Sequence, residues 1–145
     1  MFKKIKFLAI IFVLFNYTQL VMAKNNFYAD AKKKYEAKEY DQSKFLFQRN
    51  IVFNPKDYNS YLYLAKIYNV EENQREEEKN IDTVLLLDPK NEEANYMLIN
   101  IELKKSNYLK VKELTSFFSE ICSELCGKKD LIKESLKNLE PKNDS

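Results

Sequence analysis

Two stretches of sequence, the second a near repeat of the first, decide the fold of this chain. Residues 53–65 read FNPKDYNSYLYLA, and residues 87–99 read LDPKNEEANYMLI. Each begins with a large apolar residue, continues with Asn-Pro or Asp-Pro, and ends in a segment with apolar residues at helical spacing. Proline disfavours helix for the residue before it, and it can open the next helix behind an Asn or Asp N-cap. These motifs therefore predict helical hairpins that meet at the prolines.

The interval between the two prolines also aligns residues outside the proline motifs. Ala31 falls on Ala65, and Tyr40 falls on Tyr108 after two periods. Apolar residues in the second unit recur at i, i+3, i+4 and i+7, which is one face of a helix. They are Tyr61, Leu64, Ala65 and Tyr68. The period and the helical spacing together predict an all-α repeat protein.

A helix-turn-helix unit of about 34 residues with proline near its end resembles the tetratricopeptide repeat (TPR) family. Large, small and aromatic residues stand at the family's positions in repeat one as Phe27, Ala31, Tyr35, Tyr40, Ser43, Phe47 and Pro55, and in repeat two as Tyr61, Leu64, Ala65, Tyr68, Ile81, Val84 and Pro89. Repeat three offers Leu98, Leu103, Tyr108, Val111 and Phe118. The resemblance implies a right-handed solenoid of about three repeats at 24–57, 58–91 and 92–126. It departs at Asn50 and Glu77, where the family prefers Ala, and at Ser123, which replaces the third proline.

Helix boundaries follow from the apolar spacing and the turn residues. The expected repeat helices cover 26–38, 41–53, 57–70, 74–87, 91–105 and 108–126. Gly127 is expected to cap the last of them. Residues 127–145 are expected to form a capping helix over 130–139 and a loose tail over 140–145. The apolar side of that helix is made of Leu131, Ile132, Leu136 and Leu139.

The first 23 residues are predicted to be a secretory signal peptide. Three lysines precede the unbroken apolar run FLAIIFVLF at 7–15, and the segment ends in Val-Met-Ala. This order of basic, apolar and small residues is typical of a cleaved leader. Retention as a membrane anchor is the alternative, but a spanning helix needs about 20 apolar residues. We therefore expect a chain that starts at Lys24, has no membrane span after cleavage, and is periplasmic or extracellular.

Composition argues against several classes of function. The chain has no His and one Gly, so the commonest general base and a Gly-rich phosphate loop are both absent. Of 24 basic residues three lie in the leader, which leaves 21 against 22 acidic residues. Such a chain has no strong electrostatic attraction for nucleic acid. We expect no enzymatic activity, no catalytic residues, no metal, no cofactor and no nucleic-acid partner.

The TPR resemblance implies a partner-binding groove on the first helices of the repeats. Tyr provides apolar area with a polar tip, Asn can bond a peptide backbone, and the lysines favour an acidic group. The alternative is that these tyrosines pack between helices and the lysines are merely solvated. The expected groove residues are Tyr28, Lys32, Tyr35, Asn59, Leu62, Lys66, Asn69, Tyr96 and Asn100.

Cys122 and Cys126 are four positions apart near the end of the predicted third repeat. On one helix their Cα atoms would lie about 6 Å apart, within disulfide range but with awkward Cβ directions. Fraying of the helix beside Gly127 would permit the bond. Two buried thiols, intermolecular pairing and metal binding are the alternatives.

The sequence thus predicts an adaptor or assembly factor that holds a peptide segment of an envelope or secreted protein. The alternative is a structural role, by self-association into a homo-oligomer or by stacking on another repeat protein. An enzyme is the distant third reading.

Overall fold

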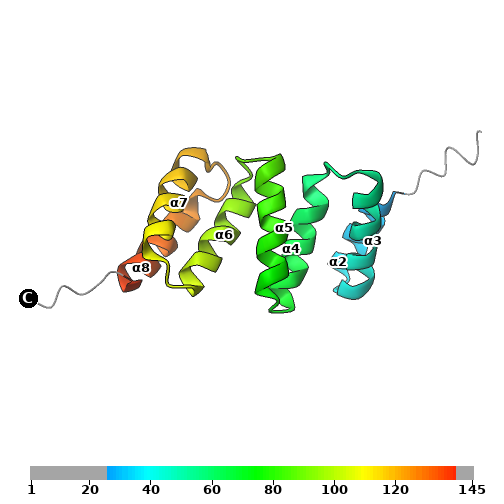
Figure 1. The fold of residues 1–145 in the computed structure, drawn as a ribbon, viewed down its shortest axis with the longest axis horizontal. Coiled ribbons are helices and arrows are strands. Elements are labelled where there is room, and N and C mark those ends of the chain that lie inside the picture. The colour runs from blue at the N-terminus through cyan, green and yellow to red at the C-terminus, as the bar shows by residue number, and fades with distance from the viewer. Residues whose placement is uncertain (1–25, 140–145) are drawn as a thin grey trace, which may run out of the picture.

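The computed structural model describes residues 26–139. The predicted leader at 1–23 and tail at 140–145 lie outside these residues. The described part is a row of helices, each packed against its neighbours in sequence (Figure 1). The helices are α2 Phe27–Glu36, α3 Tyr40–Phe53, α4 Tyr58–Val70, α5 Gln74–Leu87, α6 Glu92–Lys104, α7 Tyr108–Ile121, the 3-10 helix η1 Cys126–Lys128, and α8 Lys129–Leu139. The prediction of an all-α helical-repeat arrangement is confirmed.

Three turns, one inside each hairpin, share the same backbone geometry. The chain enters the left-handed region at Lys38, Glu72 and Ser106, with φ of 59°, 56° and 56°. In the first turn Lys38 N–H donates to the Tyr35 carbonyl at 2.9 Å, and the next N–H reaches back to the Lys34 carbonyl. The same pairs recur in the other two turns. This is a Schellman helix ending, and its return once in each hairpin shows the repeat in the backbone itself.

Three connections join one hairpin to the next element. The first connection (54–57) and the second connection (88–91) are short and carry the two prolines. In each, the N–H of the last residue donates to the carbonyl of the first at 3.0 Å. Asn91 also accepts the Ala94 N–H at 3.0 Å and so caps α6. The third connection (122–128) is longer, lacks proline and leads into α8.

The hydrophobic core follows the row of helices as three clusters. One joins the first two hairpins, the second lies between α4, α5 and α6, and the third joins the last hairpin to α8. Their buried members are Ala31, Phe47, Leu64 and Ile67; Leu62, Ala65, Ile81, Val84, Ala94 and Ile101; and Ile99, Val111, Leu114, Phe118 and Ile132. The capping helix therefore packs through Ile132, with Leu136 beside it. Leu131 of the same predicted apolar side is 54% exposed.

Asn50 and Glu77, two of the departures from the TPR-like pattern, are buried but hydrogen-bonded. Asn50 donates to Asp57 at 2.7 Å and to Ser60 at 2.9 Å. Glu77 accepts the Asn69 amide at 2.8 Å. Within residues 26–139, every buried side-chain N or O atom has a partner. A polar residue in place of alanine is tolerated here because its hydrogen bonds are made.

The predicted end of the last repeat helix is wrong. Helix α7 ends at Ile121 rather than at residue 126, and Cys122 is extended, with φ −65° and ψ 139°. Gly127 does not cap α7, because it lies in η1 with no left-handed φ. The physical cause is the Cys122–Cys126 bond together with Glu92, described below.

Among residues 26–139, no helix is both long enough and apolar enough to cross a membrane.

Candidate functional site

A groove with a volume of about 430 Å³ lies between α2, α4, α5, α6 and η1. Most of its walls come from α4 and α6, the first helices of the second and third hairpins. It is lined by Tyr35, Lys66, Asn69, Val70, Glu77, Glu93, Tyr96, Met97, Asn100, Leu125 and Lys128. Five of the predicted groove residues are among them, namely Tyr35, Lys66, Asn69, Tyr96 and Asn100.

Leu62 does not line the groove. It is 6% exposed and its side chain lies in the core shared by α4, α5 and α6. A row of Tyr28, Leu62 and Tyr96 along one open face is therefore not formed. Tyr28, at the equivalent position of α2, is less buried than Leu62, because α4 has a hairpin packed on each side whereas α2 has a neighbouring hairpin on one side only.

Tyr28, Lys32 and Asn59 also lie outside the groove. The ring of Tyr28 packs edge-on against Phe47, with centroids 5.8 Å apart, and burial raises the pKa of Tyr28 to about 12. Tyr28 instead lines a separate cavity of about 810 Å³ beside the first connection. Lys32 is exposed with Glu36 at 4.0 Å, and Asn59 is partly buried on α4. Tyr28 is thus a packing residue and Lys32 a solvated one.

Two residues that line the groove, Tyr35 and Lys66, rest on an aromatic group that includes Tyr63, which was not among the predicted groove residues. The Tyr35 ring meets Tyr40 and Tyr63 edge-on, with centroids 5.8 Å and 5.0 Å apart. Burial raises the pKa of Tyr35, and the nearby Tyr40 adds to the rise. The ammonium of Lys66 lies 4.8 Å above the Tyr63 ring. These contacts hold Tyr35 and Lys66 in position without filling the groove. An aromatic at 63 in a segment already rich in Tyr gives no sequence cue to this role.

Polar groups along the groove are partly engaged with one another. Lys66 pairs with Glu93 at 2.8 Å, and Asn69 donates to Glu77. Burial raises the pKa of Glu77, although the bond from Asn69 opposes the rise. Asn100 is partly buried and has no hydrogen-bond partner among the described residues. Its amide therefore leaves both donor and acceptor free toward the groove.

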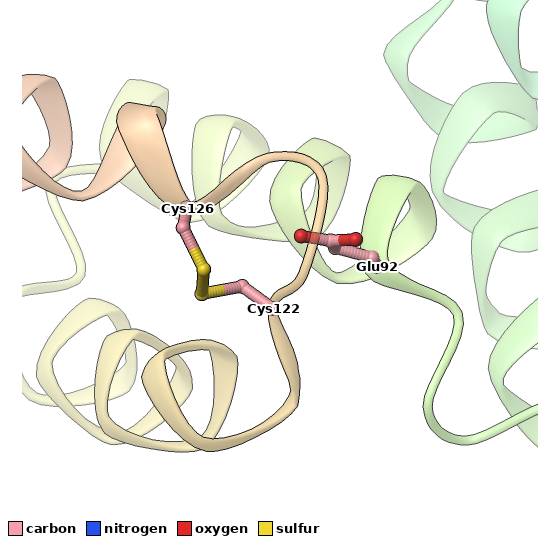
Figure 2. Close-up of side chains that lie close together, drawn as sticks. All are labelled: Glu92, Cys122 and Cys126. Carbon is pink, nitrogen blue, oxygen red and sulfur yellow. A yellow bond between two sulfur atoms is a disulfide. The ribbon is translucent and has the colours of Figure 1, made fainter.

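The third connection forms the remaining wall, and a disulfide closes it. Cys122 and Cys126 are bonded, with Cα atoms 5.2 Å apart (Figure 2). The two cysteines are not on one helix, because α7 ends before Cys122 and η1 begins at Cys126. Leu125, inside the loop that this bond closes, and Lys128, two residues after Cys126, both line the groove.

Glu92, the first residue of α6, binds the backbone of the loop that the disulfide closes. Its carboxylate accepts the backbone N–H groups of Leu125 at 2.7 Å, Ser123 at 2.8 Å and Glu124 at 3.1 Å. The Ser123 hydroxyl lies 3.3 Å from the same carboxylate. Desolvation is the largest single influence on Glu92 and opposes its ionisation. The three backbone bonds and the bond from the Ser123 hydroxyl together outweigh it, so the pKa of Glu92 is lowered. No sequence pattern links Glu92 to this loop, because the whole of the last hairpin separates them along the chain.

Glu92, Cys122 and Cys126 also bring three ligand-type atoms within 4.8 Å of one another. In this state they are not a metal site. A thiolate, not a disulfide sulfur, is the metal ligand, and both sulfurs are bonded to each other. Both Glu92 oxygens accept hydrogen bonds from the loop. The arrangement is a structural clasp.

Comparison of the sequence with models of known protein families finds no match, and comparison with curated protein sequences finds none either. Function must therefore be inferred from the groove, its charges and its free amide.

Proposed function

We propose that this chain is an exported TPR-type adaptor or assembly factor that binds an extended segment of an envelope or secreted protein in the groove. The observation that carries the proposal is Asn100, whose amide lies in a groove also lined by Tyr35 and Tyr96 and has no partner among the described residues. A free carboxamide can donate to a peptide carbonyl and accept from a peptide N–H.

The lining of the groove favours a peptide over a small polyanion or a lipid. Tyr35 and Tyr96 offer apolar area with polar tips, as expected at peptide-binding surfaces. Lys66 and Glu93 largely neutralise each other. An open groove lined by both polar and apolar side chains suits a flexible segment that makes several contacts of moderate strength.

The test uses a synthetic library of random peptides and the chain from Lys24 to Ser145, the predicted mature form. We expect a family of peptides to be retained with measurable affinity by fluorescence anisotropy. Asn100→Ala should weaken their binding about tenfold, because a peptide backbone group loses its partner. Asn59→Ala is the matched control, since it removes the same side chain from a first helix outside the groove. Retention of no peptide, or equal binding by Asn100→Ala, would refute the proposal.

A second candidate function is self-association through the outer face of the second helices. Val52 and Leu86 occupy the same repeat position on α3 and α5 and are 77% and 81% exposed. Phe45 is 57% exposed on the same helix as Val52. Sedimentation velocity should show a concentration-dependent dimer that Val52→Ser with Leu86→Ser abolishes. A wild-type chain that stays monomeric throughout excludes this candidate.

A further inference from the structure

Two lysines line the groove, and they differ in what they contact. Lys66 has its carboxylate partner in Glu93 and lies over a tyrosine ring. Lys128 has its ammonium 5.8 Å from the centroid of the Tyr96 ring. No carboxylate among residues 26–139 pairs with it. Lys128 is therefore the available cation of the groove, in place of the predicted Lys32 and Lys66.

The position of Lys128 depends on the third connection. Lys128 belongs to η1, and its N–H donates to the Leu125 carbonyl at 2.8 Å. The disulfide ties the start of η1 to the end of α7, and Glu92 ties the loop to α6 through Leu125. The disulfide and Glu92 thus anchor η1 from the side of the loop, and α8, which follows Lys128 directly, packs on α6 and α7 from the other side.

The contact with Tyr96 favours an anionic ligand over a second cation. The ring face attracts the ammonium and fixes its direction, and that ammonium keeps donors to offer. The neighbouring amide of Asn100 can bond the ligand's backbone at the same time. The fitting ligand chemistry is a carboxylate carried by a peptide, either an acidic side chain or the carboxyl terminus.

We propose that Lys128 binds a carboxylate of the captured segment and that the Cys122–Cys126 disulfide holds Lys128 where it can do so. The proposal rests on the proposed function, because it assigns a subsite within the same groove. It also makes acid selectivity redox-dependent. A dithiol that supplies two electrons and two protons converts the disulfide to two thiols and leaves as a disulfide itself. The freed loop then no longer holds η1 against the groove.

The first experiment presents the random-peptide library with free and with amidated carboxyl termini. On the oxidised chain we expect retained peptides to be enriched in Asp or Glu at one position, or to require the free terminus. These two outcomes distinguish a side chain from a carboxyl terminus. Lys128→Gln should lose this selectivity and bind the selected peptides at least about fivefold more weakly. Lys133→Gln, on the exposed side of α8, is the matched control and should change neither.

Three results separate this proposal from the proposed function. Retention of no peptide refutes both. Peptides that depend on Asn100 but show no acid preference refute only the Lys128 subsite. A preference for acidic peptides that survives in Lys128→Gln also refutes the Lys128 subsite.

The second experiment tests the disulfide with Cys122→Ser combined with Cys126→Ser. We expect acid selectivity to fall to the level of Lys128→Gln while the loss caused by Asn100→Ala persists. Amide hydrogen exchange at residues 123–125 should also quicken, which measures the loop without any ligand. The same measurement on the wild-type chain reduced by a dithiol replaces the serine variant if that variant folds poorly. Unchanged acid selectivity in the reduced chain or the serine variant overturns the role of the disulfide.

Discussion

The first two connections and the third connection do the same task with different chemistry. Each must end the second helix of a hairpin and turn the chain toward the next element. The first two use proline and one backbone hydrogen bond of 3.0 Å between residues three apart. The third uses a disulfide and the carboxylate of Glu92, a residue 31 positions before Ser123.

The replacement of proline by Ser123 shows what the difference means. Pro55 and Pro89 have no N–H to satisfy. Ser123 does have one, and Glu92 accepts it at 2.8 Å. The missing proline, which would end the helix locally, is thus offset by a contact with a distant residue. The first two connections should therefore tolerate changes elsewhere in the protein, whereas the third should depend on α6.

The largest effect should come from Glu92→Ala. This change leaves three backbone N–H groups without their charged acceptor, and water replaces it only in part. We expect a loss of about 2–3 kcal/mol in the free energy of unfolding by urea. Glu93→Ala is the matched control, because Glu93 makes an ion pair that is partly exposed and should cost less than about 1 kcal/mol. Equal losses from the two variants would mean that the third connection does not rely on Glu92.

The same contact predicts a pH dependence. The pKa of Glu92 is lowered from its ordinary value of 4.5, so the folded state holds this proton less tightly than the unfolded chain. Its stabilisation is complete above the ordinary value and is lost as the pH falls through the folded pKa. The stability gap between wild type and Glu92→Ala should therefore be constant near neutrality and should narrow in acid. A gap that widens in acid would contradict the geometry.

Reduction of the disulfide should have the next largest effect. Opening a loop of this length releases the unfolded chain from a restraint worth at most about 2 kcal/mol. We expect urea unfolding of the wild-type chain to shift by that amount with a dithiol present. The Cys122→Ser and Cys126→Ser variant should unfold identically with and without the dithiol. A shift in the unfolding of this variant on addition of the dithiol would show that the dithiol acts on something other than the Cys122–Cys126 disulfide.

Exchange of the connection chemistry gives a smaller effect. Cys122 is extended, which suits a following proline, so Ser123→Pro meets no backbone conflict at that residue. It does remove the N–H bonded to Glu92, and proline stiffens the unfolded chain in partial compensation. The net expected loss in the free energy of unfolding is about 1 kcal/mol. Pro89→Ser should cost a few tenths to about 1 kcal/mol through the unfolded chain alone. Stabilisation by Ser123→Pro would show that the third connection is simply a defective copy of the others.

The smallest effect concerns the turns inside the hairpins, which are alike in all three repeats. Lys38 and Glu72 hold left-handed backbone that glycine adopts without strain. Lys38→Gly and Glu72→Gly should each raise the free energy of unfolding by about 0.5–1 kcal/mol. Lys33→Gly, inside α2, should lower it by a similar amount. Unequal gains in the free energy of unfolding from Lys38→Gly and Glu72→Gly would show that the two turns differ in energy although their backbone geometry is the same.

Much of the fold could be predicted because its determinants are local. Pro55 and Pro89 end helices through their own backbone restrictions, and the spacing of Tyr61, Leu64 and Ala65 defines a helix face. Helix α5 was predicted with its observed bounds, and the ends of α3 and α4 were predicted correctly. Five residues that line the groove could also be predicted, since repeat position alone places them on the first helices.

The remainder was decided by contacts between distant residues, which leave no periodic trace in the sequence. Leu62 shares its repeat position with Tyr28 and Tyr96, yet it is buried in the core formed with α5 and α6. The early end of α7 follows from Glu92. Its carboxylate accepts the N–H groups of Ser123 and Leu125, which would donate to helix carbonyls if α7 continued. Lys128 lies at the groove through η1, which follows a loop closed by the disulfide and bonded to Glu92. Local geometry therefore determined the repeat, and tertiary contacts decided which side chains remain free to bind.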